Sequence, residues 1–127
     1  MNKYGQAAIK AAELIKLGNS PIEAWEKATI EIFGVSTSQK KGCPKSTFLA
    51  LAEVGLVKNI SPGSYTKAKE NKEYALKAIE ILKQYKIQPS TLSTKELWNK
   101  VQNIDKKYNS QMDVVLALWN NNLIKKI

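Results

Sequence analysis

The sequence predicts a single all-α domain of about six helices, spanning residues 1–127. The chain has 127 residues, of which 43% are hydrophobic, and this length and composition are typical of one folded domain with its own core. Its apolar residues recur mainly at helical spacing, interrupted by capping signatures. No segment shows the sustained apolar–polar alternation of a half-buried strand, so a sheet is disfavoured.

The first two helices are expected over residues 2–17 and from Pro21 to about Phe33. The first has an alanine-rich apolar stripe, and Gly18 supplies the left-handed residue that commonly ends a helix. Ser20-Pro21-Ile22-Glu23 has the pattern of a capping box with proline at the first helical position. Gly34 ends the second helix. The apolar face of this helix consists of Ile22, Trp25, Ala28, Thr29, Ile32 and Phe33.

A third helix is expected to have Pro44 in its first turn and Cys43 near its N-cap. The following residues are apolar on nearly all sides, which predicts a buried helix. Gly55 fits the position just after the helix, and Leu56 or Val57 would then make the hydrophobic contact of a Schellman ending.

The fourth helix is expected to begin between Tyr65 and Asn71 and to end near Tyr85, with Tyr85 on its apolar stripe. Ile87–Thr91 contains Pro89 and is expected to be a loop. These boundaries leave a turn-rich connection over residues 58–64 between the third and fourth helices.

The last two helices are both preceded by capping signatures. Ser93-Thr94-Lys95-Glu96 is a capping box, and Ser110-Gln111-Met112-Asp113 places an acid three residues after a serine. The helix that starts near Gln111 is apolar on most sides. We therefore expect this helix and the helix near Pro44 to lie at the centre of the domain.

Two short strings resemble each other. Ala52–Ile60 and Leu118–Ile127 each contain the end of an apolar helix at Gly or Asn, then two aliphatic residues, then lysine and isoleucine. This resemblance is too short to indicate a repeat, and we interpret both strings as helix endings of the same type.

The charge of the chain comes from lysine alone. It has 20 basic and 11 acidic residues, a net charge of +9 and no histidine, and the printed sequence contains no arginine. Without histidine, the Ser-His and Cys-His dyads and the commonest zinc ligand are excluded. Without arginine, rigid bidentate recognition of guanine or phosphate is excluded, although lysine still binds phosphate as a point charge. The alternative is that the lysines are solvated surface residues of a chain with a biased composition.

Other features exclude further classes of protein. One cysteine cannot form an internal disulfide, and no apolar run approaches the roughly 20 residues of a membrane span. The start of the chain lacks the layout of a secretion signal. We therefore expect a cytoplasmic protein with no membrane partner. With no histidine and two aspartates, we expect neither a metal site nor a cofactor.

The segment Ser36–Phe48 is the best candidate for a binding site. It joins two apolar helices and carries Lys40, Lys41 and Lys45 around the expected start of the third helix. The unpaired N–H groups and the dipole of a helix start favour an anion there, and Ser46 offers a further donor. The alternative is a lysine-rich surface loop with no ligand.

Cys43 and Glu53 are the other residues of chemical interest. A thiol at a helix start flanked by lysines favours the reactive thiolate. Without histidine, however, a cysteine nucleophile lacks its usual proton shuttle, and a lone cysteine is more often structural. We expect no enzymatic activity. Glu53 interrupts an apolar helix, where it either pairs with a lysine or faces a groove.

A helix-turn-helix arrangement is an alternative for residues 51–71. A helix, a glycine turn and a second segment rich in Ser, Tyr, Thr, Lys and Asn would suit contacts with DNA. The connection Gly55–Ser64 is longer than the usual turn of this motif.

Several strings together resemble a small bacterial family known only as a domain of unknown function. The most specific are Q-K-K-G-C-P at residues 39–44 and N-S-Q-M-D-V-V at residues 109–115. Shorter matching strings are Y-G at 4–5, P-I-E-A-W at 21–25, F-L-A-L at 48–51, G-L-V-K at 55–58 and N-K-E-Y-A at 71–75. The resemblance implies a single domain, and it brings no known activity, substrate or catalytic residue, so it leaves the function open. Both specific strings begin helices expected at the centre, so they are candidates to converge.

The leading hypothesis is therefore a binding module for a phosphate-type anion or a nucleic-acid backbone. Its candidate residues are Lys40, Lys41, Cys43, Lys45 and Ser46, completed by Asn109, Ser110 and Gln111. The second hypothesis is a protein-interaction or structural module that binds a partner through an apolar groove. The third, a cysteine-dependent enzyme, requires a reactive Cys43.

Overall fold

The structure is a computed structural model that describes residues 2–85, 90–102 and 108–125. It confirms the all-α prediction, because the described residues form helices and contain no strand beyond one isolated bridge. The expected loop around Pro89 and the polar residues near Asp105 lie largely outside the described residues. The helices are α1 (Lys3–Lys16), α2 (Pro21–Phe33), α3 (Gly42–Glu53), α4 (Glu70–Tyr85), α5 (Thr94–Val101) and α6 (Gln111–Asn120).

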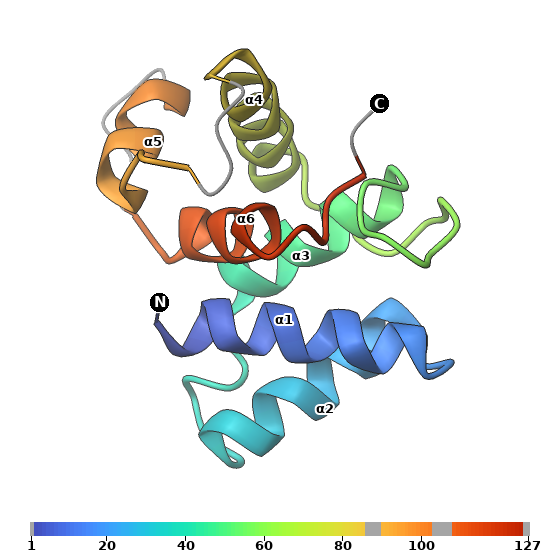
Figure 1. Cartoon of the computed structure of the whole chain (residues 1–127). Coiled ribbons are helices and arrows are strands. Elements are labelled where there is room, and N and C mark those ends of the chain that lie inside the picture. The colour runs from blue at the N-terminus through green and yellow to red at the C-terminus, as the bar shows by residue number, and fades with distance from the viewer. Residues whose placement is uncertain (1, 86–89, 103–107, 126–127) are drawn as a thin grey trace.

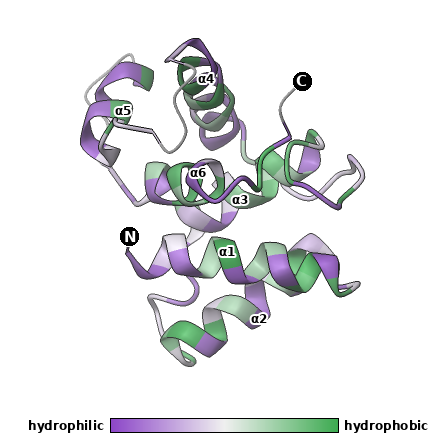
Figure 2. Ribbon diagram, viewed as in Figure 1, coloured by the Kyte–Doolittle hydropathy of each residue, from purple (hydrophilic) through white to green (hydrophobic). Residues whose placement is uncertain are grey.

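The helices are arranged in three layers (Figure 1). In that view α1 and α2 lie below, α3 and α6 lie in the middle, and α4 and α5 lie above. The sequence prediction that the helices near Pro44 and Gln111 are central is therefore confirmed. Hydrophobic residues dominate α6 after a hydrophilic start (Figure 2).

Burial of the two middle helices is almost complete. In α3 every residue from Thr47 to Ala52 is buried, and in α6 every residue from Val114 to Trp119 is buried. Below them, α1 packs closely on α2 because alanines line the contact. Their small side chains let two helices approach without voids. The alanines of α1 and α2 with no exposed surface are Ala7, Ala8, Ala11, Ala24 and Ala28.

The helix starts follow the sequence prediction in part. Ser93 and Glu96 form the expected capping box at α5. At α2, the Ser20 hydroxyl accepts from the Glu23 N–H at 3.3 Å, but it also donates to the Glu23 carboxylate at 3.1 Å. The carboxylate therefore bonds the serine side chain, in place of the backbone N–H that a full capping box uses.

The predicted endings of α3 and of α1 are confirmed. After α3, Gly55 has a φ of +79°, and the N–H groups of Gly55 and Leu56 donate to the carbonyls of Ala52 and Leu51, both at 3.0 Å. These are the two bonds of a Schellman ending. Gly18 ends α1 with a φ of +107°.

The two similar strings of the sequence meet in space. Asn122, with a φ of +58°, ends α6 as Gly55 ends α3, and the Leu123 N–H donates to the Leu118 carbonyl at 2.9 Å. The segments after the two helices then pair antiparallel through Val57 and Ile124. Both side chains of this pair are buried. Their resemblance thus reflects two equivalent helix endings that contact each other.

The bridge has one backbone hydrogen bond on each side. The Lys58 N–H donates to the Leu123 carbonyl at 3.0 Å, and the Lys125 N–H donates to the Leu56 carbonyl at 2.7 Å. The bridge therefore connects the C-terminal ends of the two central helices directly.

Glu53 holds the connection between α3 and α4. Its carboxylate accepts hydrogen bonds from the N–H groups of Tyr65 at 2.8 Å and Thr66 at 3.1 Å, and it pairs with the Lys72 ammonium at 3.0 Å. The hydrogen bond from Lys72 contributes most, followed by those from Thr66 and Tyr65, and together they lower the pKa of Glu53 from 4.5 to about 2. The prediction that Glu53 pairs with a lysine is therefore confirmed.

Two details of the sequence prediction are wrong. Ile22 and Tyr85, expected on apolar faces, are 43% and 41% exposed because they lie at the first and last turns of their helices. The start of α4 at Glu70 falls within the predicted range of residues 65–71, so residues 64–69 are not helical. The helix-turn-helix alternative therefore lacks its second helix at the residues that were to contact DNA.

We predict that Gly55→Ala destabilises the protein more than Gly18→Ala does. Both glycines have a positive φ, which costs an alanine about 1–2 kcal/mol. A Cβ at Gly55 would also lie 2.7 Å from Pro62 Cγ, whereas a Cβ at Gly18 meets nothing within 4 Å. Urea unfolding should show a loss for Gly55→Ala that is larger by at least about 1 kcal/mol. Equal losses would contradict the close packing of Pro62 on Gly55.

We also predict a pH-dependent stability difference between the wild type and Glu53→Gln. Because the folded-state pKa is lowered, the charged carboxylate stabilises the fold above about pH 4.5, and this stabilisation is lost as the pH falls through about 2. In urea unfolding, the wild type should have a larger free energy of unfolding than Glu53→Gln near neutral pH. This difference should shrink as the pH falls from about 4.5 to about 2. Glu80→Gln, on the exposed side of α4, is the control and should show no such trend. A difference independent of pH would contradict the role of the Glu53 charge.

Candidate functional site

The candidate site lies where the α2–α3 loop returns to the body of the protein. The Gln39 side-chain amide donates to the Thr29 hydroxyl at 3.0 Å, and this hydroxyl donates to the Trp25 carbonyl at 2.8 Å. The Tyr4 hydroxyl donates to the Ser38 carbonyl at 2.9 Å. The loop is therefore fastened to α2 on one side and to α1 on the other.

A pocket of about 160 Å³ opens between this loop, α2 and the first turns of α3. We call it the Trp25 pocket; it is lined by Trp25, Glu26, Gln39, Lys40 and Lys45. Its volume is well above the roughly 10–15 Å³ that one water molecule requires. The ammonium groups of Lys40 and Lys45 and the carboxylate of Glu26 form no ion pair among the described residues.

Trp25 is the unusual residue of this pocket. Its side chain is 1% exposed and stacks on Phe48 of α3 with the ring centroids 5.2 Å apart. Its indole Nε1–H has no hydrogen-bond partner within the described part of the chain. An unpaired buried donor costs about 1–3 kcal/mol.

The structure places the predicted lysines in two different environments. Lys40 and Lys45 line the Trp25 pocket together. The Lys41 ammonium instead lies over the Tyr4 ring, 5.9 Å from its centroid. The three lysines, expected to form one group, therefore do not all line the same pocket.

The start of α3 agrees with the prediction, because Pro44 lies in its first turn and Cys43 lies two residues after the N-cap. Lys41 occupies the N-cap position and makes no side-chain capping bond. Proline is tolerated in the first turn because the N–H groups of that turn have no partner within the helix. Cys43 is a half-buried free thiol inside the first turn, and neither it nor the half-buried Ser46 lines the pocket.

The second polar string, residues 109–113, does not line the Trp25 pocket. Gln111 is fully buried, with its side-chain oxygen accepting from the Asn109 N–H at 2.7 Å and its amide donating to Asn71 at 3.3 Å. The Ser110 hydroxyl accepts from Asn2 at 3.4 Å. Both polar strings thus contact the first turn of α1, one through Tyr4 and the other through Asn2, but these bonds do not join them into one site.

The capping signature predicted at Ser110 is replaced by Tyr108. Ser110 has a left-handed φ of +66° and makes no capping bond, whereas an N-cap serine normally has an extended backbone. The Tyr108 hydroxyl accepts from the Asp113 N–H at 3.0 Å and donates to the Asp113 carboxylate at 2.5 Å. Burial and the bond to Asp113 raise the pKa of Tyr108 well above its usual range.

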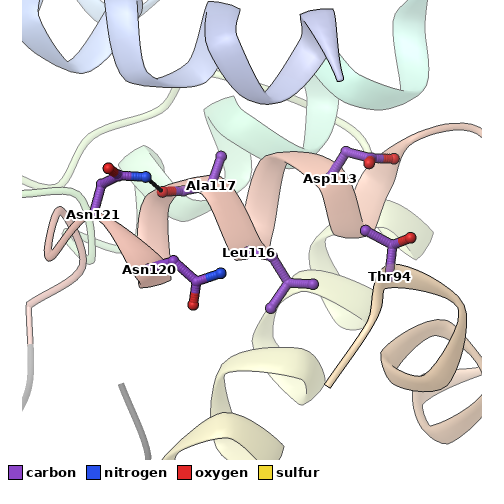
Figure 3. Close-up of a pocket in the computed structure, with 6 residues that line it drawn as sticks. All are labelled: Thr94, Asp113, Leu116, Ala117, Asn120 and Asn121. Carbon is purple, nitrogen blue, oxygen red and sulfur yellow. Dashed lines mark hydrogen bonds between the residues drawn. The ribbon is translucent and has the colours of Figure 1, made fainter. Parts of the chain in front are cut away.

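A second pocket, of about 200 Å³, lies between α6 and the start of α5 (Figure 3). Several of its polar groups already have protein partners. The Asn121 amide donates to the Ala117 carbonyl at 2.8 Å, the Asn120 oxygen accepts from the Ser90 N–H at 2.8 Å, and Asp113 bonds Tyr108. This pocket therefore offers a ligand fewer unpaired groups than the Trp25 pocket.

Several large apolar residues near α1 and α2 are exposed. They are Leu17 just after α1, Ile22 and Ile30 on α2, and Val35 just after α2. The C-terminal part of α2 is correspondingly hydrophobic (Figure 2). Leu14 and Ile30 line an open cleft of about 430 Å³ whose rim carries charged side chains.

Residues 2–85, 90–102 and 108–125 contain neither a metal-binding cluster nor a membrane-spanning helix. No group of three or more His, Cys, Asp or Glu side chains is placed to hold a metal ion. No helix there has the length and apolar composition needed to cross a membrane.

A comparison with protein-family models identifies the family. The model described as a family of unknown function, DUF6979, matches residues 1–125. The chain belongs to this family. The matched region of this DUF6979 chain contains every residue of the Trp25 pocket. No curated protein and no solved structure matches the chain.

Proposed function

We propose that this DUF6979 protein is a binding module for a small anion and that the Trp25 pocket is its site. The observation that carries the proposal is that Lys40 and Lys45 line one cavity and form no ion pair in the described part of the chain. A carboxylate or phosphate group in this cavity would be attracted by both ammonium groups and would accept hydrogen bonds from them.

The position of the pocket adds to its affinity for negative charge. Lys45 belongs to the first turns of α3, and no side chain caps the start of this helix. The unpaired backbone N–H groups and the positive end of the helix dipole stabilise an anion nearby, typically by 0.3–1 kcal/mol. Lys40 and Lys45 are exposed, so their attraction is screened by salt.

The same observations favour binding over catalysis. The chain has no histidine to act as a proton shuttle, and the Cys43 thiol does not line the pocket. Of the residues that line the pocket, the Glu26 carboxylate is the general-base candidate, and no serine, threonine or cysteine nucleophile lines the pocket beside it. Lys40 and Lys45 are therefore kept from the predicted set, and Trp25 and Gln39 are added. The predicted residues that are left out are Lys41, Cys43, Ser46, Asn109, Ser110 and Gln111.

We predict that Lys40→Gln/Lys45→Gln weakens the binding of inorganic phosphate at low salt by about tenfold, because two attractive charges are removed. The control is Lys41→Gln/Lys95→Gln, which lowers the net charge equally but removes two exposed lysines that do not line the pocket. It should change the affinity by less than about twofold. Binding is followed by the indole N–H resonance of Trp25 in NMR titrations, assigned with Trp25→Phe.

Two outcomes would contradict the proposal. In the first, phosphate leaves the Trp25 indole resonance of the wild type unchanged at low salt. In the second, the control variant loses as much affinity as Lys40→Gln/Lys45→Gln, which would show that the binding depends on net charge alone.

A further inference from the structure

The Trp25 pocket contains a carboxylate beside its two lysines, and this carboxylate is the basis of a further inference. Glu26 follows Trp25 on α2 and lines the same cavity as Lys40 and Lys45. A site for a simple anion would be weakened by a carboxylate in its wall, because like charges repel. We propose that the ligand is a small zwitterion, a molecule of the amino-acid class that carries both a carboxylate and an ammonium group.

The protein leaves Glu26 available for this role. Its carboxylate has no ion pair or side-chain hydrogen bond among the described residues, although two lysines line the same cavity. Other carboxylates of the chain are used by the fold. Glu23 and Glu96 bond the capping serines of α2 and α5, Glu31 pairs with Lys10, and Glu53 pairs with Lys72.

Each charged end of a zwitterion has a matching group in the pocket. The ligand carboxylate would accept hydrogen bonds from the ammonium groups of Lys40 and Lys45, and the ligand ammonium would donate to Glu26. The volume of about 160 Å³ suits a ligand with a short carbon chain.

This inference rests on the proposed anion-binding function, because it assigns the ligand class of the same site. The two can fail separately. A pocket that binds phosphate without preferring zwitterions would retain the anion function and lose the inference. A pocket that binds no anion at all would lose both.

The test compares amino acids with matched acids that lack the amine. The pairs are glycine with acetate, β-alanine with propanoate, and 4-aminobutanoate with butanoate, and inorganic phosphate is titrated alongside. Each ligand is added to the full chain at low salt, and the indole resonance of Trp25 reports its binding. We expect at least one amino acid to bind at least about tenfold more tightly than its amine-free partner, since one additional charged contact forms.

The variant Glu26→Gln assigns the preference to the carboxylate. Glu26 is exposed, so the substitution removes charge with little effect on packing, and we expect the amino acid and its amine-free partner to bind it within about twofold of each other. The control Glu80→Gln makes the same charge change on the exposed side of α4 and should keep the preference.

Three outcomes would overturn the inference. If phosphate shifts the Trp25 resonance but no amino acid binds more tightly than its partner, the ligand is a simple anion. If Glu26→Gln keeps the preference, Glu26 does not hold the ammonium group. If neither phosphate nor any organic ligand shifts the resonance, both the zwitterion inference and the proposed anion-binding function are wrong.

Discussion

The contact between the ends of the two central helices is the constraint on which the rest of the structure depends. After α3 and α6 end at Gly55 and Asn122, the chain segments that follow pair through Val57 and Ile124. Both of these side chains are buried, and backbone hydrogen bonds on either side fix their register. The pairing joins segments separated by more than sixty positions of sequence, so it closes the central layer of the domain.

The Trp25 pocket depends on that central layer through α3. The C-terminal end of α3 leads into the bridge, and its N-terminal turns form one wall of the pocket. Between them, Phe48 is fully buried and supports the Trp25 ring. A rigid α3 therefore places Trp25 beside Lys40 and Lys45 without any direct bond between the three side chains. The loop that carries Lys40 is held separately, by Gln39 on α2 and by the Tyr4 hydroxyl of α1.

Local signals were predictable from the sequence because each one is decided by a few neighbouring residues. The capping box at Ser93 and the Schellman ending at Gly55 depend on side chains within one turn of the helix end. The burial of α3 and α6 followed from their apolar composition. The prediction failed at Ser110, because the cap of α6 is decided by Tyr108, whose hydroxyl bonds Asp113 and replaces the serine.

The site was predictable only in part, for the same reason. Its lysines could be identified as a charged cluster at a helix start, but the ring of Tyr4 draws Lys41 away from Lys40 and Lys45. Trp25 was correctly assigned to the core by its helical spacing. Spacing cannot show that its indole N–H lacks a partner, because this depends on which polar groups the fold brings near it. Spacing likewise cannot show that Glu26 lines the same pocket as Lys40 and Lys45, because the fold brings these residues together.

Native-state hydrogen exchange of the bridge amides tests most directly whether the paired helix ends hold the structure together. The amide protons of Lys58 and Lys125, which form the two bridge hydrogen bonds, should exchange only through openings whose free energy approaches that of global unfolding. The exposed Asn59 between these segments donates no backbone bond in the described structure and should exchange quickly. Exchange of Lys58 and Lys125 as fast as that of Asn59 would contradict the bridge as the constraint on the central pair.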